Sequence, residues 1–397
     1  MKYIRDALNN LRLHIIFTAV VPVALMTACA SAPKVIEVDQ ARVNEFAQHG
    51  YDSGIDYATA VARFSMQLEN NFIQITSVQP KREGRYPLII YLPGLGESAD
   101  AAPELRNAWA KSGYVVLSLQ PLKEDEDIWS SDAARRADFA FIRQDRYSPS
   151  VISHRLDVIR GLIEYLKHGV ASGDEYLKDI DLSRIAIIGF DVGASTAMIV
   201  SGEVVPEVTR TDLDIQPAIV VALSPHAESA GTDVDTRYQN INVPVLSVTS
   251  NSDDEAHGNA SISLHQIPFQ HMPPENKYLL LLANASHSLI GDGDTANDVQ
   301  IEGESEAKQT EYESSGKPRS RSGHHGKESS RVEADDNGHP KRDGEESPTQ
   351  RAKVKVAIAQ ITTAFLNAYV KKDQFAADWL NKNTQTWLYG VGELQEK

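Results

Sequence analysis

An aspartate flanked by glycines is the residue in this sequence most suited to chemistry. Gly189 and Gly193 stand two residues before and two residues after Asp191, between an apolar run and a stretch of small residues. This spacing is typical of a nucleophile elbow, a tight strand-to-helix turn that presents its central side chain at the end of a sheet and at a helix N-terminus. The central residue is usually Ser, so a carboxylate stands here in place of a hydroxyl. Asp191 taken alone could equally cap the following helix.

Other polar groups follow the ends of further apolar runs. Asp253 and its neighbour Asp254 come after one run, and His287 comes after the next. A glycine-rich turn that contains Leu95 follows an earlier run. The backbone amides of Leu95 and Val192 are candidates to stabilise one developing negative charge. These groups would meet if the runs are neighbouring strands of one sheet.

Short β-rich runs alternate with helical patterns from about residue 70 onward. Near-continuous apolar runs of this length suit strands that are buried on both faces, as in a parallel sheet. Apolar residues recur every three or four positions in 152–168 and 354–369, which indicates helices. We therefore predict an α/β domain with a mostly parallel, doubly wound sheet. The predicted strands are 72–78, 87–92, 114–119, 185–189, 218–223, 245–249 and 278–282.

Taken together, these motifs resemble the α/β-hydrolase superfamily, especially enzymes of the dienelactone hydrolase, chlorophyllase and platelet-activating-factor acetylhydrolase type. The resemblance covers about residues 70–293, and 351–381 is similar to the closing helix of those enzymes. It implies that Asp191 takes the place of the nucleophile, Asp253 that of the acid and His287 that of the base, in the chain order of this fold. Asp254 is the alternative acid.

The resemblance also implies an oxyanion hole formed by the amides of Leu95 and Val192. Relatives that use an aspartate nucleophile usually carry Trp at the position of Val192 and insert a cap domain before the strand that bears the acid. The stretch 223–245 is too short for a cap. We therefore expect no large cap domain, although residues 120–150 could supply a small lid.

An aspartate at the elbow changes the expected reaction. Attack of a carboxylate on an ester would give a high-energy anhydride, whereas displacement of a halide or opening of an epoxide gives an alkyl ester that activated water hydrolyses. One hypothesis is a hydrolase that acts on an unknown small or ester-like substrate through Asp191. A second is a catalytically silent fold that serves as a binding lipoprotein. A third is a structural lipoprotein that contacts a partner through 295–350.

The N-terminus resembles a bacterial lipoprotein signal. Residues 1–28 combine a basic start with an uncharged run of twelve, which is shorter than the roughly 20 residues of a membrane-spanning helix. Leu25 to Cys29 looks like a lipobox, in which Cys29 becomes the acylated first residue of the mature protein. The next two residues are Ala and Ser, which by resemblance favours the outer membrane, facing the periplasm. We expect 29–50 to be a tether.

Composition and charge limit the remaining partners. The chain carries 55 acidic and 39 basic residues, a net charge of −16, which argues against nucleic acid as a partner. Its single Cys excludes an intramolecular disulfide and a Cys-based zinc cluster. No metal or organic cofactor is implied, because the proposed chemistry needs only side chains and water. The expected partners are a small-molecule substrate and, through Cys29, a membrane.

One polar segment interrupts the predicted domain. Residues 295–350 contain 13 acidic and 8 basic residues and neither Leu nor Phe. Such a segment cannot bury enough apolar surface to offset its ordering entropy, which predicts a disordered insertion. The sequence thus divides into a hydrolase domain over 51–294, this insertion, and C-terminal helices over 351–397 that complete the domain.

Overall fold

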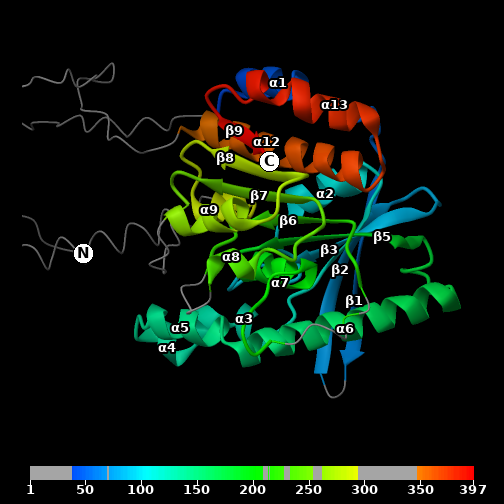
Figure 1. The fold of residues 1–397 in the computed structure, drawn as a ribbon. Helices are drawn as coiled ribbons and strands as arrows, with labels where there is room; N and C mark the ends of the chain where they lie inside the picture. The colour runs from blue at the N-terminus through cyan, green and yellow to red at the C-terminus, as the bar shows by residue number, and fades with distance from the viewer. Residues whose placement is uncertain are drawn as a thin grey trace, which may run out of the picture. The chain divides into compact units, whose positions relative to one another are not determined.

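A computed structural model of the protein describes residues 38–68, 71–208, 213, 215–227, 233–253, 262–293 and 347–397. These residues form a nine-stranded sheet in the order β1-β2-β4-β3-β5-β6-β7-β8-β9 (Figure 1). The strands are β1 Thr59–Leu68, β2 Asn71–Pro80, β3 Tyr86–Leu92, β4 Val115–Ser118, β5 Ile180–Phe190, β6 Ile219–Leu223, β7 Val245–Ser250, β8 Lys277–Leu282 and β9 Gly392–Glu396.

The centre of the sheet is parallel and its edges are antiparallel. Strands β4, β3, β5, β6, β7 and β8 pair in parallel, whereas β1 and β2 form a hairpin that joins β4 antiparallel, and β9 runs antiparallel to β8. Every residue of β3, β6 and β7 is buried. This burial explains the unbroken apolar runs, because helices cover both faces of these strands. The predicted α/β class with a mostly parallel sheet is confirmed.

Helices cover the two faces of the sheet in two layers (Figure 1). Alternation along β3 shows the division, since Ile89 and Tyr91 join one apolar core while Leu88 and Ile90 join the other. The first layer contains α2 Pro103–Lys111, α10 His287–Ile290, α12 Pro348–Tyr369, α13 Gln374–Lys382 and α14 Thr384–Trp387. The second contains α6 Pro149–Ser172, α7 Val192–Ser201, α8 Val234–Arg237 and α9 Ile262–His271.

A group of short helices lies between β4 and α6. It consists of α3 Lys123–Glu126, η1 Ile128–Ser130, α4 Asp132–Arg135 and α5 Phe139–Arg146, and we call it the lid. Its own small core is made by Ile128, Ala133 and Ile142. Leu95 packs against this core, so the lid contacts the glycine-rich turn after β3.

The structure differs from the expectations drawn from the sequence in three places. The expected tether is too long, because Gln40–Gln48 form helix α1, where Phe46 stacks on Trp387 at 4.5 Å between ring centroids. The hairpin partner β1 was not predicted. The C-terminal segment adds strand β9 to its helices, and α12 already begins at Pro348.

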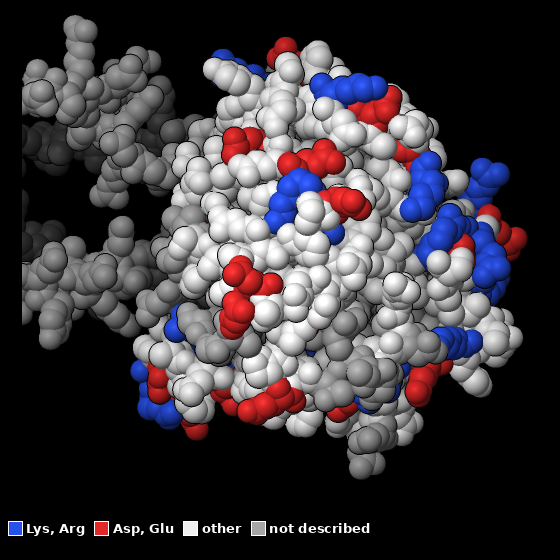
Figure 2. Space-filling view, viewed as in Figure 1, with Lys and Arg blue, Asp and Glu red and all other residues white. Residues whose placement is uncertain are grey.

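Several sequence predictions lie outside the described residues. They are the signal over 1–28, the acylated Cys29, the adjoining part of the tether, the alternative acid Asp254 and nearly all of the insertion. Among the residues that the structure describes, no helix is both long and apolar enough to cross a membrane. On the face shown in Figure 2, acidic groups lie mainly over the middle and lower parts, Lys and Arg gather mainly at the right-hand side, and wide uncharged areas separate them.

Candidate active site

The turn after β5 holds Asp191 in a strained backbone conformation. Its φ of 51° and ψ of −116° are unusual for a residue with a side chain and cost about 1–3 kcal/mol. Both flanking glycines are required by close backbone contacts. A Cβ on Gly189 would lie 2.1 Å from the carbonyl oxygen of Gly193, and a Cβ on Gly193 would lie 2.0 Å from that of Leu92. The glycine spacing therefore serves the sharp turn that the motif predicts.

The carboxylate of Asp191 is oriented by hydrogen bonds on both oxygens. Oδ2 accepts from the amide of Leu95 at 3.0 Å, and Oδ1 accepts from the Tyr147 hydroxyl at 2.7 Å. Asp191 stands at the N-cap position of α7, but its side chain makes no capping hydrogen bond. The alternative of a simple helix cap is therefore wrong. Val192 begins α7, so the helix N-terminus lies at the same turn.

The predicted acid and histidine form a direct pair at the ends of β7 and β8. Nδ1 of His287 lies 2.9 Å from Oδ1 of Asp253, whose side chain is completely buried. Burial by itself raises the pKa of Asp253, but its hydrogen-bond and charge partners, His287 foremost and then His265 and Thr249, together hold this pKa below its usual value. The ring of His287 also packs on Phe190, 4.7 Å between centroids. His287 thus lies beside the residue that precedes Asp191.

Further groups hold Asp253 and were not predicted. The Ser224 hydroxyl donates to Oδ1 at 2.9 Å, and the Thr249 hydroxyl donates to Oδ2 at 2.6 Å. A second, fully buried histidine, His265, has its Nδ1 3.6 Å from Oδ2. Burial lowers the pKa of His265 despite the nearby carboxylate, which favours the neutral ring. Asp253 is therefore enclosed by donors on both oxygens.

A second carboxyl group lies close to Asp191. Glu97 accepts a hydrogen bond from the Gly94 amide at 2.8 Å, and a Cβ added to Gly94 would lie 3.2 Å from the Cβ of Asp191. Burial and the charge of Asp191 raise the pKa of Glu97 to about 7, although the Gly94 amide and His287 act in the opposite direction. The candidate site therefore contains an acid that titrates near neutral pH.

The residues missed by sequence analysis had weak signals. Tyr147 follows α5, and its position over Asp191 depends on how the lid folds. Ser224 has a φ of 52° at the end of β6, a strand end like those that carry the other site residues. Glu97 stands within the predicted glycine-rich turn, so its proximity could have been suspected, whereas its pKa depends on burial.

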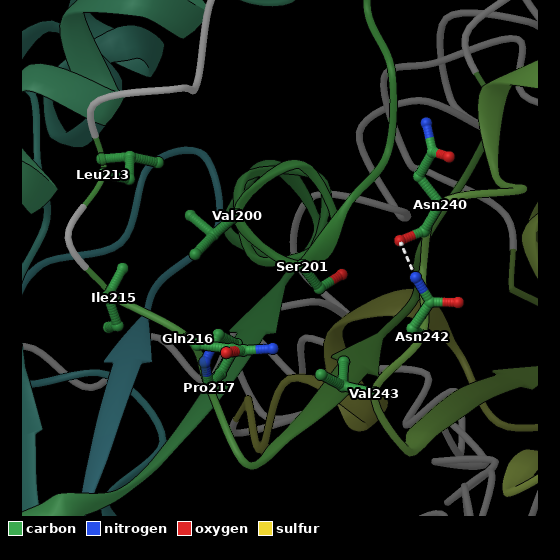
Figure 3. Close-up of a pocket in the computed structure, with 9 residues that line it drawn as sticks. All are labelled: Val200, Ser201, Leu213, Ile215, Gln216, Pro217, Asn240, Asn242 and Val243. Carbon is green, nitrogen blue, oxygen red and sulfur yellow. Dashed lines mark hydrogen bonds between the residues drawn. The ribbon is translucent and has the colours of Figure 1, made fainter.

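A hollow of about 400 Å³ lies away from these residues, at the end of the sheet where the central strands β6 and β7 begin (Figure 3). Residues before β6 and β7 and at the end of α7 form this hollow. Asp191, Asp253 and His287 lie at the other end of the sheet, because they follow the C-terminal ends of β5, β7 and β8. The lining residues that the structure describes carry amide, hydroxyl and apolar groups, and none of these residues is charged or a histidine. The lining residues are Val200, Ser201, Leu213, Ile215, Gln216, Pro217, Asn240, Asn242 and Val243.

Comparison with known proteins does not assign the chain to a family. No protein-family model matches the sequence, and no curated protein matches it significantly. Within the described ranges, no group of three or more His, Cys, Asp or Glu side chains is arranged to hold a metal ion.

Proposed function

We propose that this protein is a hydrolase of the α/β-hydrolase fold and that it works through a covalent intermediate on Asp191. The observation that carries the proposal is the strained turn that holds the Asp191 carboxylate against the Leu95 amide, with the His287–Asp253 pair beside it. Asp191, Asp253 and His287 follow β5, β7 and β8, respectively, and this order supports the proposed α/β-hydrolase fold. The strain at Asp191 indicates a functional role, because a solvent-facing turn would not require it.

In the proposed mechanism the two oxygens of Asp191 have different roles. Oδ1 would attack an electrophilic carbon, and the leaving group would depart with its bonding electron pair, which gives an alkyl ester. His287 would then take a proton from water, through the ring nitrogen opposite its bond to Asp253, as the hydroxide adds to the ester carbonyl. The resulting negative charge would form on Oδ2, at the Leu95 amide. Collapse would release the alcohol, which takes the proton from His287, and would leave Asp191 as a carboxylic acid. Loss of that remaining proton to water would restore the carboxylate.

A single-turnover experiment tests this proposal. Reaction in heavy-oxygen water should place the label in the Asp191 carboxylate, because water attacks the carboxyl carbon. His287→Gln should accumulate the alkyl ester, detected by intact-mass and peptide analysis, while Asp191→Asn should form no adduct. Alkyl halides, epoxides and esters make up the substrate panel. Absence of label and adduct across this panel would overturn the covalent mechanism.

A catalytically silent binding protein is the second candidate. Two observations favour it. The Tyr147 hydroxyl donates a hydrogen bond to Oδ1, the oxygen of Asp191 that would attack the substrate, and Asp191 as a whole residue is only 6% exposed. Asp191→Ser distinguishes the two functions. Hydrolysis of p-nitrophenyl esters by this variant would show that Leu95, His287 and Asp253 still form working machinery. Its inactivity, together with no adduct in the natural protein, would favour the binding protein.

We further propose that the protein is held at the bacterial outer membrane by a lipid on Cys29. This proposal rests on the lipobox-like sequence and on the Ala and Ser that follow it. A lipid provides attachment without a basic surface, which is compatible with the net charge of −16. The substrate would then meet the enzyme at the cell envelope.

A further inference from the structure

A fully buried ion pair connects the lid to helix α6. Arg155 binds Asp125 through two hydrogen bonds, Nε to Oδ2 at 2.7 Å and Nη2 to Oδ1 at 2.9 Å. The exposed fraction is 0% for Asp125 and 1% for Arg155. Arg146 adds a second guanidinium, with Nη1 3.5 Å from Asp125 Oδ1. Burial of these charges is costly, so their retention calls for an explanation other than stability.

One end of the ion pair is bonded to the turn that supplies the amide donor. The carbonyl oxygen of Asp125 accepts from the Gly96 amide at 2.8 Å. The preceding amide, that of Leu95, donates to Oδ2 of Asp191. The position of α3 therefore sets the direction of the amide that would face the developing oxyanion.

The other end of the ion pair is bonded to the segment that supplies the hydroxyl donor. Nη1 of Arg155 donates to the carbonyl oxygen of Arg146 at 2.8 Å. The next residue, Tyr147, donates its hydroxyl to Oδ1 of Asp191. Each donor on Asp191 is thus one residue away from a backbone group bound by the ion pair.

We propose that Asp125 and Arg155 are positioning residues. Together they hold the Leu95 amide and the Tyr147 hydroxyl in the positions from which both donate to Asp191. The proposal rests on the proposed function of Asp191 and deepens it, because it identifies what aligns the nucleophile and the oxyanion site together. A bidentate arginine–carboxylate pair suits this role, since its planar geometry fixes orientation as well as distance. The side-chain hydrogen bonds of Asp125 and Arg155 go to groups other than Asp191, so the effect passes through Leu95 and Tyr147.

The double variant Asp125→Leu/Arg155→Met tests positioning by removing both charges of the bidentate pair, while Arg146 keeps its ion pair with Asp145. Apolar replacement of a buried ion pair is often neutral or stabilising, so the variant should stay folded. We expect amide hydrogen exchange to become about tenfold faster in both segments 93–98 and 143–148. Turnover on the substrate identified with the natural protein should fall about 100-fold in kcat with little change in KM, because misplacement affects the reacting groups.

Two further variants complete the test. Arg155→Lys retains the charge but not the bidentate fork, so we expect a smaller change in the same two segments. Should the double variant not fold, this conservative variant decides the question by the same exchange measurement. Glu203→Leu/Arg237→Met is the matched control, because it removes a buried pair, joined at 2.6 Å, that connects the segment after α7 to α8 and not the lid to α6. The control should leave exchange at 93–98 and 143–148 unchanged.

Exchange is measured without substrate, which separates this proposal from the proposed function. Unchanged exchange in a folded double variant, or a change in only one segment, would overturn joint positioning even if Asp191 forms an adduct. Faster exchange in both segments would support it even if no substrate is turned over. Failure of the heavy-oxygen labelling alone would count against the hydrolase and not against the ion pair.

Discussion

Replacement of Glu97 by Gln should stabilise the protein at neutral and alkaline pH. The Glu97 carboxyl is withdrawn from water and lies close to Asp191, and its pKa is raised from the ordinary 4.5 to about 7. Gln keeps the shape and can still accept from the Gly94 amide, which donates to Oε2 at 2.8 Å. The substitution therefore removes a charge without removing the hydrogen bond.

The direction in which stability changes with pH follows from proton binding to Glu97. Between pH 4.5 and about 7 the folded protein holds the Glu97 proton more tightly than the unfolded chain does, so stability decreases as the pH rises through this range. The full difference would correspond to about 3 kcal/mol, at about 1.36 kcal/mol for each pKa unit. Because Glu97 is only half-buried as a residue, we expect about 1–3 kcal/mol of stabilisation above pH 7. Near pH 4 the two proteins should be about equally stable.

Urea unfolding at a series of pH values provides the assay. The unfolding free energy of Glu97→Gln minus that of the natural protein should rise between pH 4.5 and about 7 and then level off. Glu83→Gln is the control, because Glu83 is exposed and its substitution should give a difference that stays flat. A flat difference for Glu97→Gln, or a less stable variant at pH 8, would refute the reasoning.

Three further predictions concern the elbow, the acid and the N-terminus. Gly193→Ala should destabilise the protein by at least about 3 kcal/mol in urea unfolding, because the new Cβ would lie 2.0 Å from the Leu92 carbonyl oxygen. Asp253→Asn should destabilise it by about 1–3 kcal/mol at pH 7, since the side chain loses acceptor capacity for buried donors. The low pKa of Asp253 stabilises the fold above its ordinary 3.8, so this effect should shrink as the pH falls through the folded value. Cys29→Ser should abolish incorporation of radiolabelled palmitate in cells, and labelling that persists would contradict the lipid anchor.

The sequence alone indicated the class of the fold and the ends of its strands. Unbroken apolar runs mark strands buried on both faces, and this local property needs no knowledge of distant contacts. In parallel strands the carboxyl ends share one edge, which is why residues after three such runs could be expected together. Asp253 and His287 meet at 2.9 Å as a result. The glycine spacing around Asp191 likewise reflects a local steric requirement.

The edges of the fold were less evident in the sequence. Strands β1 and β9 are partly exposed, so they lack the unbroken apolar pattern of the central strands. Helix α1 depends on distant packing, because Trp387 stacks on Phe46 and donates to its carbonyl oxygen at 2.8 Å. Contacts across more than 300 residues leave no local periodicity to recognise.

The contacts that hold the Asp191 carboxylate, and the groups that surround it, depend on long-range folding. Tyr147 reaches Oδ1 because the lid folds back and the Asp125–Arg155 pair secures its last helix to α6. Glu97 titrates near neutral pH because of burial and the neighbouring charge of Asp191. Local sequence pattern therefore specified where the strands and their turns lie. Hydrogen-bond partners and pKa values arise from groups far apart in the chain, and they exist only once the fold brings those groups together and excludes water.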